Sequence, residues 1–588
     1  MSYNIRRQLN DKERAVLNSV PDITAHLLFH RGILDNKIAE KFLAPDYEKD
    51  IHDPFLLKDA EKSADRIVQA INNNERIAIY ADYDADGIPG SVIFNDLFKR
   101  IGFSNFSIYI PHRHDEGFGL NVEAVEQLAG EGVKLLITVD CGVTDVMPVT
   151  RAKKLGMDVI ITDHHEPPTP LPPAFAIVDH KQKDCPYPDK NLCGSGVAYK
   201  LIQAILKKNR FGLKEGHEKW LLDMVGIATL SDMVSLTGEN RIFAHFGLAV
   251  LRKSPRKGLM QLLRKLNINQ RFLTEDDIAF MITPRINAAS RMGKPMDAFK
   301  LLSADTDEDA HFFADHLDKI NNERKGVVAS LVKEVKKILH ERYQDSLPDV
   351  IVLGNPLWRP SLLGLVANSC AEEFDRPAFF WGRDGDDIIK GSCRSEGQTN
   401  VVELMRATPI ETFLQFGGHH HSGGFAVSND DVHFLEQRLN KAVGDMKKAL
   451  NKNIKKTGDF DLEVDSIENK SDSVIDMELS LEMIDSRLYN EINKLAPFGI
   501  GNPKPVFLFR DVVPVEVKIF GKGKEHVELS FKKKSGEKVS AISFFGAKES
   551  WASKVIANKT IDLVASLEKS MYRGRSELRL RIIDVIVK

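Results

Sequence analysis

The chain has 588 residues, of which 43% are hydrophobic and 28% charged, and its formal net charge is −3 at pH 7. This balance is typical of a soluble globular protein, and the length predicts three or four domains. Because the overall charge is near zero, a nucleic-acid partner would have to be held by local clusters of Lys and Arg. No apolar run reaches the roughly 18 residues that a membrane-spanning helix needs, so we expect no membrane span.

The cysteines are odd in number, widely spaced and form no CxxC pair. This pattern favours a reduced, cytoplasmic protein over a disulfide framework, and it does not predict a zinc site. The five positions are Cys141, Cys185, Cys193, Cys370 and Cys393.

The sequence pattern of residues 51–304 predicts an α/β unit, which a short helical segment precedes. Residues 1–50 combine charges with short apolar groups and predict a small helical segment. Within 51–304, the apolar runs RIAIYAD, FSIYIP, KLLITVD, DVIITD and AFAIVD alternate with helical stretches, and residues 195–302 are mainly helical in pattern. Continuous apolar strands separated by helices are typical of a parallel sheet covered on both faces.

A long helix is predicted next, within a connector at 305–345. Thr306 and Asp309 fit a capping box, and the helix can continue to about Tyr343, which is about 50 Å of rise. An ordinary amphipathic core helix is the alternative. The apolar positions at helical spacing are Phe313, Leu317, Ile320, Val327, Leu331, Val335 and Leu339.

The last two units differ in pattern. A second α/β unit, 346–450, opens at DVIVLG, and the stretch NKNIKKTG (451–458) is interpreted as a linker. Residues 455–588 contain five alternating strands with Gly- and Lys-rich turns, which predict a small β-barrel of the OB type. Barrels of this type commonly bind single-stranded nucleic acid, and the Lys-rich turns would bind its backbone mainly through charge.

Acidic residues and histidines follow three of the predicted strands. Because the carboxyl ends of parallel strands lie at one edge of a sheet, we expect these side chains to converge. Clustered carboxylates repel one another unless cations neutralise them, and a mixed Asp/His set suits Mn²⁺ or Mg²⁺ better than zinc. Two such ions are the usual means of phosphoryl displacement. The residues are Asp82, Asp84, Asp86, Asp140, Asp163, His164 and His165.

Each of these residues taken alone has a simpler explanation. An Asp after a strand is usually a turn former or a helix cap, and a His-His pair is usually a solvated loop. The coincidence of three polar strand ends in one unit favours the metal site.

Several motifs resemble a known family. DYDADG, DCG and DHH resemble the DHH phosphoesterase superfamily, whose fourth motif appears as ATLSDMVSL. RGILDNKIAEKFL, LCGSGVAYKL, PRINAASRMG, GSCRS, FGGHHHSGGF and PFGIGNPKPVF then follow in order over nearly the whole chain. This ordered set resembles the RecJ family, with DHH, DHHA1 and OB domains.

The resemblance implies roles for individual residues. Asp140 would bridge two metal ions, Asp163 would orient a neighbouring histidine, and His165 would lie against the scissile phosphate. The other implied metal ligands are Asp84, Asp86, His164 and Asp232. The implied DNA contacts are Arg285, Asn287 and Arg291 on one side, and Ser392, Arg394, Gly418 and His419 in a DHHA1-like wall on the other.

The chain departs from the family pattern at four sites, two of which are Pro89, where a small or hydroxyl residue is usual, and Ser290, where Gly is common. Tyr80 stands where many relatives have His, so we expect Asp82 to complete the shell of the first ion. Arg359 stands where His is frequent. Simpler readings also exist for the implied DNA contacts, because GSCRS could be a turn, the three adjacent histidines a solvated loop, and Arg285 and Arg291 ordinary ion-pair partners.

The function implied by the resemblance is a metal-dependent exodeoxyribonuclease. It would hydrolyse single-stranded DNA in the 5′→3′ direction to 5′-mononucleotides with two Mn²⁺ or Mg²⁺ ions, in DNA repair and recombination. A cytoplasmic monomer working with a single-strand-binding protein or a helicase is expected. A chain ending near Asn453 is expected to keep this chemistry on short oligonucleotides and to bind long strands of DNA more weakly. The alternatives are another DHH phosphodiesterase, acting on nano-RNA or cyclic dinucleotides, and a non-catalytic DNA-binding scaffold.

Overall fold

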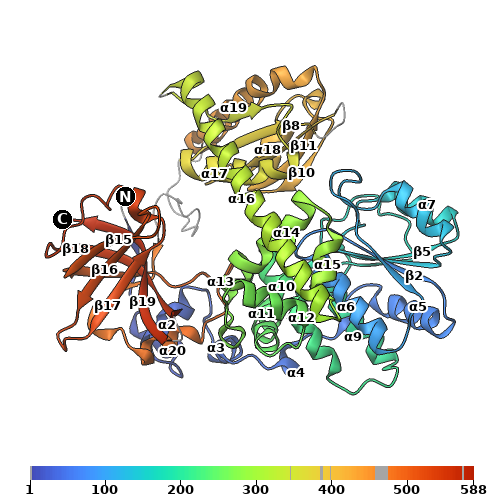
Figure 1. Cartoon of the computed structure of the whole chain (residues 1–588), viewed down its shortest axis with the longest axis horizontal. Helices are drawn as coiled ribbons and strands as arrows, with labels where there is room; N and C mark the ends of the chain where they lie inside the picture. The colour runs from blue at the N-terminus through green and yellow to red at the C-terminus, as the bar shows by residue number, and fades with distance from the viewer. Residues whose placement is uncertain (1–2, 345, 384–387, 398, 457–473, 573–574) are drawn as a thin grey trace.

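The computed structural model describes residues 3–344, 346–383, 388–397, 399–456, 474–572 and 575–588, with the backbone alone at 419, 449–456, 571–572 and 575–576. The chain forms three lobes (Figure 1). A blue-to-green lobe is joined by the long helix α16, Asp307–Tyr343, to a yellow-orange lobe, and a red lobe lies beside the first. The α/β fold with a C-terminal barrel confirms the predicted fold class.

The first lobe is built on a five-stranded parallel sheet in the order β3-β2-β4-β5-β6. Its residues alternate between two cores: Ile77 and Ile79 face one, while Ala78 and Tyr80 face the other. Helices thus cover both faces, as the apolar runs predicted. The strands are β2 Ile77–Ala81, β3 Phe106–Tyr109, β4 Leu135–Val139, β5 Asp158–Thr162 and β6 Ala176–Val178.

Helices make up the rest of this lobe, including the whole of its second half, which confirms the helical pattern of 195–302. They are α4 Tyr47–Asp50, η1 Pro54–Leu56, α5 Ala60–Asn72, α6 Gly87–Arg100, α7 Val122–Gly130, α8 Val146–Lys154, α9 Gly194–Lys208, η2 His217–Leu221, α10 Leu222–Ser231, α11 Gly238–Leu251, α12 Lys257–Lys265, η3 Gln270–Phe272, α13 Glu275–Asp277, η4 Ile278–Ile282, α14 Thr283–Met292 and α15 Met296–Leu302.

Helix α16 begins where the capping pattern predicted. Thr306 Oγ1 accepts a hydrogen bond from the Asp309 backbone N–H at 3.0 Å. Leu317 belongs to the core of the first lobe, whereas Val335 and Leu339 belong to that of the second. The helix is therefore both a connector and a core helix, which rigidly joins the two lobes.

The second lobe has a mixed sheet in the order β10-β11-β9-β8-β7, in which only β7 and β8 run parallel. The prediction of a linker at 451–458 is wrong for residues 451–456. They belong to α19, which continues to Lys456 because the sequence has no helix breaker before Gly458. Residues 457–458 lie outside the described residues. The elements are β7 Ile351–Gly354, α17 Pro360–Phe374, β8 Ala378–Gly382, β9 Ile389–Arg394, α18 Val401–Arg406, η5 Ile410–Thr412, β10 Gln415–His419, β11 Ser422–Val427, η6 Asp431–Phe434 and α19 Leu435–Lys456.

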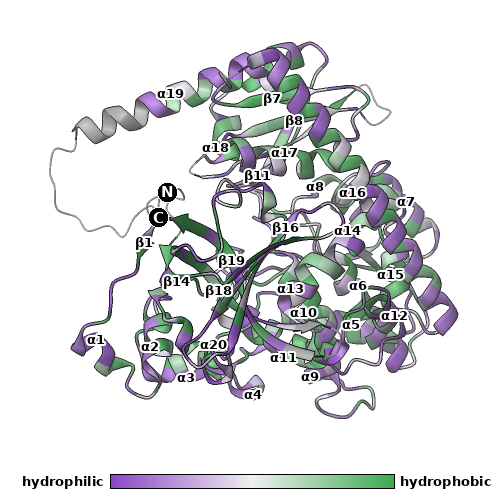
Figure 2. Cartoon of the chain, turned by 60° about the vertical axis from the view of Figure 1, so that its left-hand side comes forward, coloured by the Kyte–Doolittle hydropathy of each residue, from purple (hydrophilic) through white to green (hydrophobic). Residues whose placement is uncertain are grey.

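The third lobe is the predicted barrel, with two more strands in its sheet than the five expected. Strands β14 and β15 flank Pro514, yet they lie toward opposite ends of the sheet order, because β14 pairs with β18 and β15 with β16. Figure 2 shows hydrophobic residues gathered along β18 and β19. The elements are β12 Val474–Ile475, β13 Met477–Glu478, η7 Leu481–Met483, α20 Ser486–Asn493, β14 Phe507–Val512, β15 Glu516–Phe520, β16 His526–Lys532, β17 Lys538–Ser543, η8 Gly546–Lys548, β18 Ile561–Tyr572 and β19 Arg575–Val587.

The N-terminal segment is helical as predicted, but it belongs to the third lobe. Leu27 and Leu28 of α2 share one core with Phe507 and Phe531 of the barrel. Strand β1 pairs in parallel with β12, and both termini lie at this lobe (Figure 1). The sequence could not show this, because the contacts join the two ends of the chain. The elements are β1 Asn4–Ile5, α1 Asp11–Val16, α2 Asp22–Phe29 and α3 Asn36–Leu43.

Among the described residues, no helix is both long and apolar enough to cross a membrane. All five cysteines are buried and free of disulfides.

Candidate active site

The predicted acidic residues and histidines meet at the carboxyl edge of the first sheet. Asp82–Asp86 follow β2, Asp140 follows β4, and Asp163–His165 follow β5, while Asp232 comes from the end of α10. Three sets of ligand atoms each lie within 4.8 Å of one another: Asp140, His164 and His165; Asp86, His164 and Asp232; and Asp82, Asp84 and Asp140.

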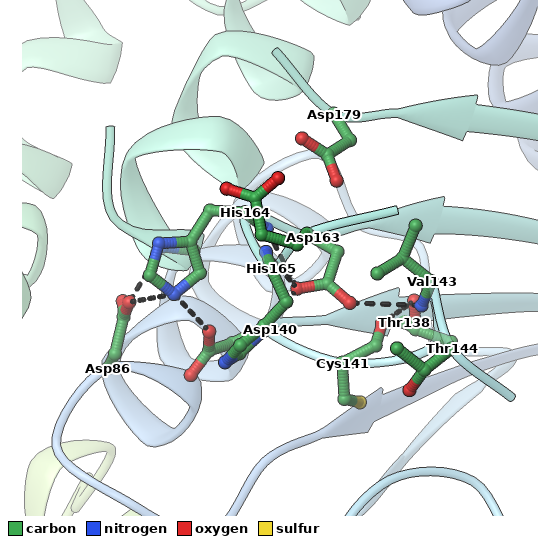
Figure 3. A network of polar contacts seen from close by, with 12 residues as sticks. Asp86, Thr138, Asp140, Cys141, Val143, Thr144, Asp163, His164, His165 and Asp179 are labelled. Carbon is green, nitrogen blue, oxygen red and sulfur yellow. Dashed lines mark hydrogen bonds and ion pairs between the residues drawn. The ribbon is translucent and has the colours of Figure 1, made fainter. Parts of the chain in front are cut away.

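His164 lies at the centre of the cluster, between Asp86 and Asp140 (Figure 3). Its Nε2 atom is 3.1 Å from Asp140 Oδ1, 3.7 Å from Asp232 Oδ2 and 3.9 Å from Asp86 Oδ2. Burial, together with the neighbouring charge of His165, lowers the pKa of His164 to about 3. The ring is therefore neutral near neutral pH, which is the form that binds a metal ion.

The start of helix α9 fixes Asp86. The Gly194 and Ser195 backbone N–H groups donate to its two carboxylate oxygens at 2.6 and 2.7 Å. The positive end of the helix dipole stabilises the carboxylate there. A Cβ at Gly194 would lie 2.5 Å from Asp140 Oδ1, so only glycine allows α9 to approach both aspartates.

Asp140 has an unusual backbone conformation, with φ of 62°. A non-glycine residue in the left-handed region is uncommon, and such residues concentrate at functional sites. The side chain is only 3% exposed. Its Oδ1 atom makes no hydrogen bond, despite the short distance to His164, and Oδ1 of Asp82 also lacks a partner.

Burial and mutual repulsion raise the pKa values of the carboxyl groups in the cluster. The pKa of Asp86 rises to about 6, through burial first and the charge of Asp84 second. The same causes raise the pKa values of Asp82, Asp140 and Asp232 well above their usual range. Buried anionic oxygens without proton donors fit divalent cations, and the oxygen-rich set suits Mn²⁺ or Mg²⁺.

Asp163 orients His165. Its Oδ1 atom is 2.7 Å from His165 Nδ1, and its Oδ2 atom accepts a hydrogen bond from the Val143 backbone N–H at 3.0 Å (Figure 3). Burial alone would lower the pKa of His165, but the hydrogen bond with Asp163 and its charge raise it to about 9. A protonated imidazole is a poor metal ligand and a good partner for a phosphate oxygen.

The Tyr80 side chain points away from the cluster. Its hydroxyl donates to the Gly119 carbonyl at 2.8 Å, and its ring stacks on Tyr109. Tyr80 therefore offers no ligand to the cluster, whereas Asp82 takes part in it.

Arginines from several elements lie next to the acidic cluster. Burial lowers the pKa of Arg291 to about 9, and the nearby positive charges of Arg113, Arg324 and Arg394 add to this effect, whereas Asp84 opposes it. Arg291 Nη1 donates to the Ser361 carbonyl of α17 at 2.7 Å, which joins the first two lobes directly. These four arginines thus form one basic array, which includes the predicted DNA contacts Arg291 and Arg394.

Two other predicted DNA contacts have internal partners. Arg285 is 4% exposed and pairs with Asp318 of α16 at 2.8 Å, which is the ion pair considered as its alternative role. The Asn287 side chain accepts a hydrogen bond from the Ala85 backbone N–H at 2.9 Å and supports the acidic loop after β2.

The remaining predicted contacts lie on β9 and β10 of the second lobe, which flank β11. Ser392 on β9 is in register with Gly424, and Gly418 on β10 has a φ of 142°, where a Cβ would meet the Ser422 carbonyl at 2.2 Å. The His419 backbone pairs with Ser422, but its side chain lies outside the described residues. Arg359 is exposed at the start of α17.

The sequence analysis missed a loop after β3. Arg113 lies over the Tyr83 ring at 4.9 Å, and Phe118, which is 51% exposed, packs against His165 with ring centroids 5.6 Å apart. The sequence did contain a signal for this loop, because the polar stretch HRHDEGFG follows a fourth predicted strand, which ends at the same edge of the sheet.

Three family models match the chain: the DHH family N-terminal domain at residues 76–229, the DHHA1 domain at 348–454 and the RecJ OB domain at 475–584. The single-stranded-DNA-specific exonuclease RecJ of Bacillus subtilis is 32% identical over 590 residues, which covers 100% of this chain and 71% of the relative. The protein of the same name from Haemophilus influenzae is 30% identical over 596 residues, covering 99% of each chain.

The crystal structure of RecJ in complex with Mn²⁺ from Thermus thermophilus superposes with a TM-score of 0.78 at 25% identity, covering 99% of this chain and 79% of that one. The similarity includes all three lobes, and the ligand clusters of this chain fit the same kind of ion. The chain therefore belongs to the RecJ family of DHH phosphoesterases.

Proposed function

We propose that this protein is a metal-dependent exonuclease specific for single-stranded DNA, which releases 5′-mononucleotides in the 5′→3′ direction during DNA repair and recombination. The observation that carries the proposal is the acidic cluster facing an array of arginines that comes from two lobes. The names of the Bacillus and Haemophilus relatives support the substrate, and the polarity rests on the family resemblance.

The residues of the cluster would have separate roles in hydrolysis. The carboxylates of the cluster and neutral His164 would hold two divalent cations, which when bound neutralise charge on the scissile phosphate and its leaving oxygen. His165 keeps a proton on the ring beside the cluster, so it can donate a hydrogen bond to a phosphate oxygen. Asp163 holds that ring in place.

The basic array would bind the DNA backbone. Arg113, Arg291, Arg324 and Arg394 bring four positive charges near one another, which costs free energy unless an anion lies among them. The exposed Phe118 ring can stack on a base. Direct contact between Arg291 and Ser361 beside the cluster supports a narrow passage that excludes duplex DNA.

The test is hydrolysis by the full-length protein with Mn²⁺. The substrates are 5′-labelled single-stranded DNA, duplex DNA, short RNA, a cyclic dinucleotide and pyrophosphate, with Asp140→Asn as the matched inactive variant. We expect mononucleotides from single-stranded DNA alone. Preference for short RNA or the cyclic dinucleotide would identify another DHH phosphodiesterase, and DNA binding without hydrolysis would identify a scaffold.

Several finer expectations stay predictions. They are the monomeric state, the cytoplasmic location, and cooperation with a single-strand-binding protein or a helicase.

A further inference from the structure

A loop of the third lobe contacts the loop that begins with the metal-ligand candidate Asp232. The first loop, residues 496–502, follows α20 and contains the motif PFGIGN, and the second spans residues 232–237. We propose that the 496–502 loop is a positioning element for Asp232, so that the third lobe sets the geometry of the metal centre. This inference rests on the proposed function for the role of Asp232.

The contact between the two loops is direct and tight. The Leu236 backbone N–H donates to the Ile500 carbonyl at 2.7 Å. A Cβ at Gly499 would lie 2.8 Å from Leu236 Cδ1, and one at Gly501 would lie 2.1 Å from Ser235 Oγ. A side chain at either glycine would therefore force Leu236 or Ser235 of the Asp232 loop to move.

The 496–502 loop has a fixed shape. Asn502 is fully buried, and its Nδ2 atom donates to the carbonyls of Leu495 at 2.8 Å and Pro497 at 2.9 Å. Its Oδ1 atom accepts a hydrogen bond from Arg31 Nε at 2.8 Å. Backbone hydrogen bonds run in both directions between Gly499 and Asn502, at 2.9 and 3.1 Å. A loop with these internal bonds can transmit a displacement instead of absorbing it.

A second contact holds the same part of the first lobe. Arg241, in the first turn of α11 just after the Asp232 loop, is 3% exposed. Its guanidinium donates to the carbonyls of Leu495 at 2.9 Å, Ala496 at 3.0 Å and Phe42 at 2.9 Å. The third lobe therefore contacts the Asp232 loop at its centre and the helix at its end.

The first lobe holds the Asp232 loop through Asn240, and it holds Ser231, the residue just before the loop, through Thr283. Asn240 Nδ2 donates to the Ser235 carbonyl at 3.1 Å, and the Ser231 and Thr283 hydroxyls lie 2.5 Å apart. Met233 is left-handed, with φ of 59°, and 72% exposed, so it adds backbone strain and little packing. Metal ligands must be held to within roughly 0.5 Å, which makes an external support significant for Asp232.

The experiment compares two glycine variants of the full-length protein. Gly501→Ala places a methyl group against Ser235, whereas Gly536→Ala, in a hairpin of the same lobe, has Lys532 Cε as its nearest neighbour at 3.9 Å. Both glycines have positive φ, 74° and 89°, so both substitutions carry a similar backbone cost. Of the two, only Gly501→Ala places its methyl group against the Asp232 loop.

The readout is Mn²⁺ binding without substrate, measured by electron paramagnetic resonance of the free ion, with the midpoint of thermal unfolding measured in parallel. We expect Gly501→Ala to weaken Mn²⁺ binding by about 10-fold, as for residues that orient metal ligands, and Gly536→Ala to leave it unchanged. Adding Ser235→Ala, which removes the closest contact atom, should restore part of the affinity.

Wild-type Mn²⁺ affinity in Gly501→Ala would overturn the positioning role, as would equal weakening in Gly536→Ala. If Gly501→Ala does not fold, Gly499→Ala makes a milder contact with Leu236, and it must shift Mn²⁺ binding in the same direction. Failure of the wild-type protein to bind Mn²⁺ would instead overturn the proposed function.

Discussion

The charge on His165 offers a quantitative test of the site, through the substitution Asp163→Asn. The pKa of His165 is raised from 6.5 to about 9 because Asp163 accepts its Nδ1 hydrogen bond and places a buried charge beside it. The stabilising interaction is complete below the ordinary pKa of 6.5 and is lost as the pH rises through about 9. An amide at position 163 removes the charge, so the pKa of His165 should return to 6.5 or below.

The size of the effect follows from the two pKa values. At about pH 8, roughly 90% of His165 is protonated with Asp163 in place and roughly 3% without its charge. At about pH 6 both fractions stay above roughly 70%. If the protonated ring binds the scissile phosphate, Asp163→Asn should lower kcat/KM about 30-fold at pH 8 and less than about 2-fold at pH 6.

The assay is single-stranded DNA hydrolysis at saturating Mn²⁺ across this pH range, expressed as the ratio of wild type to variant at each pH. The ratio cancels the titration of groups that both proteins share. Asp179→Asn is the comparison, because Asp179 is a buried acid at the next strand end that acts on His165 through charge alone, so its removal should change the ratio at pH 8 less than Asp163→Asn does. An equal loss at both pH values would refute the charge argument and leave Asp163 with a purely geometric role.

Four further outcomes are expected. Asp140→Asn should abolish hydrolysis, yet raise the urea midpoint of the metal-free protein at pH 8, because it removes a buried charge. The pKa of Asp86 is raised to about 6 in the folded protein. Protonated Asp86 therefore stabilises the metal-free fold at pH below 3.8, and this contribution to the free energy of unfolding is lost as the pH rises through about 6, which urea unfolding in chelator will show. Mn²⁺ or Mg²⁺ should support turnover, Zn²⁺ poorly, and excess chelator should stop it. A chain ending near Asn453, which the sequence led us to expect to keep its chemistry, should instead aggregate, as light scattering would show, because the apolar faces of α2 and α3 lose their cover.

Local patterns predicted the parts of the fold that depend on local burial. The strands of the first sheet are apolar on both faces, so their sequences stand out, and Thr306 marks the start of α16 through its own side chain. Strand β14 was missed because its sequence, FLFRDV, begins with three consecutive apolar residues and does not alternate. The packing of α2 on the barrel has no local signal, since its partners lie at the other end of the chain.

The same distinction applies to the site. The strand-end rule brought Asp82, Asp140 and His164 together correctly, because parallel strands end at one edge. It could not place Arg285, whose partner Asp318 comes from α16, or Arg113, whose neighbours come from other elements. Charged residues are positioned by tertiary contacts, and periodicity carries no information about these.

The site contains a set of buried carboxylates and a set of buried arginines, and the charged form of each set is unfavourable without a ligand. Burial raises the pKa values of Asp140 and Asp232 and lowers those of Arg291 and Arg394, so in both sets the charged form is disfavoured. They could neutralise each other by direct pairing, yet no ion pair joins them among the described residues. Helix α16 is packed into the cores of both lobes that carry them. A fold that holds opposite charges near each other but unpaired leaves room for a metal ion on one side and a phosphate on the other, which together satisfy both sets.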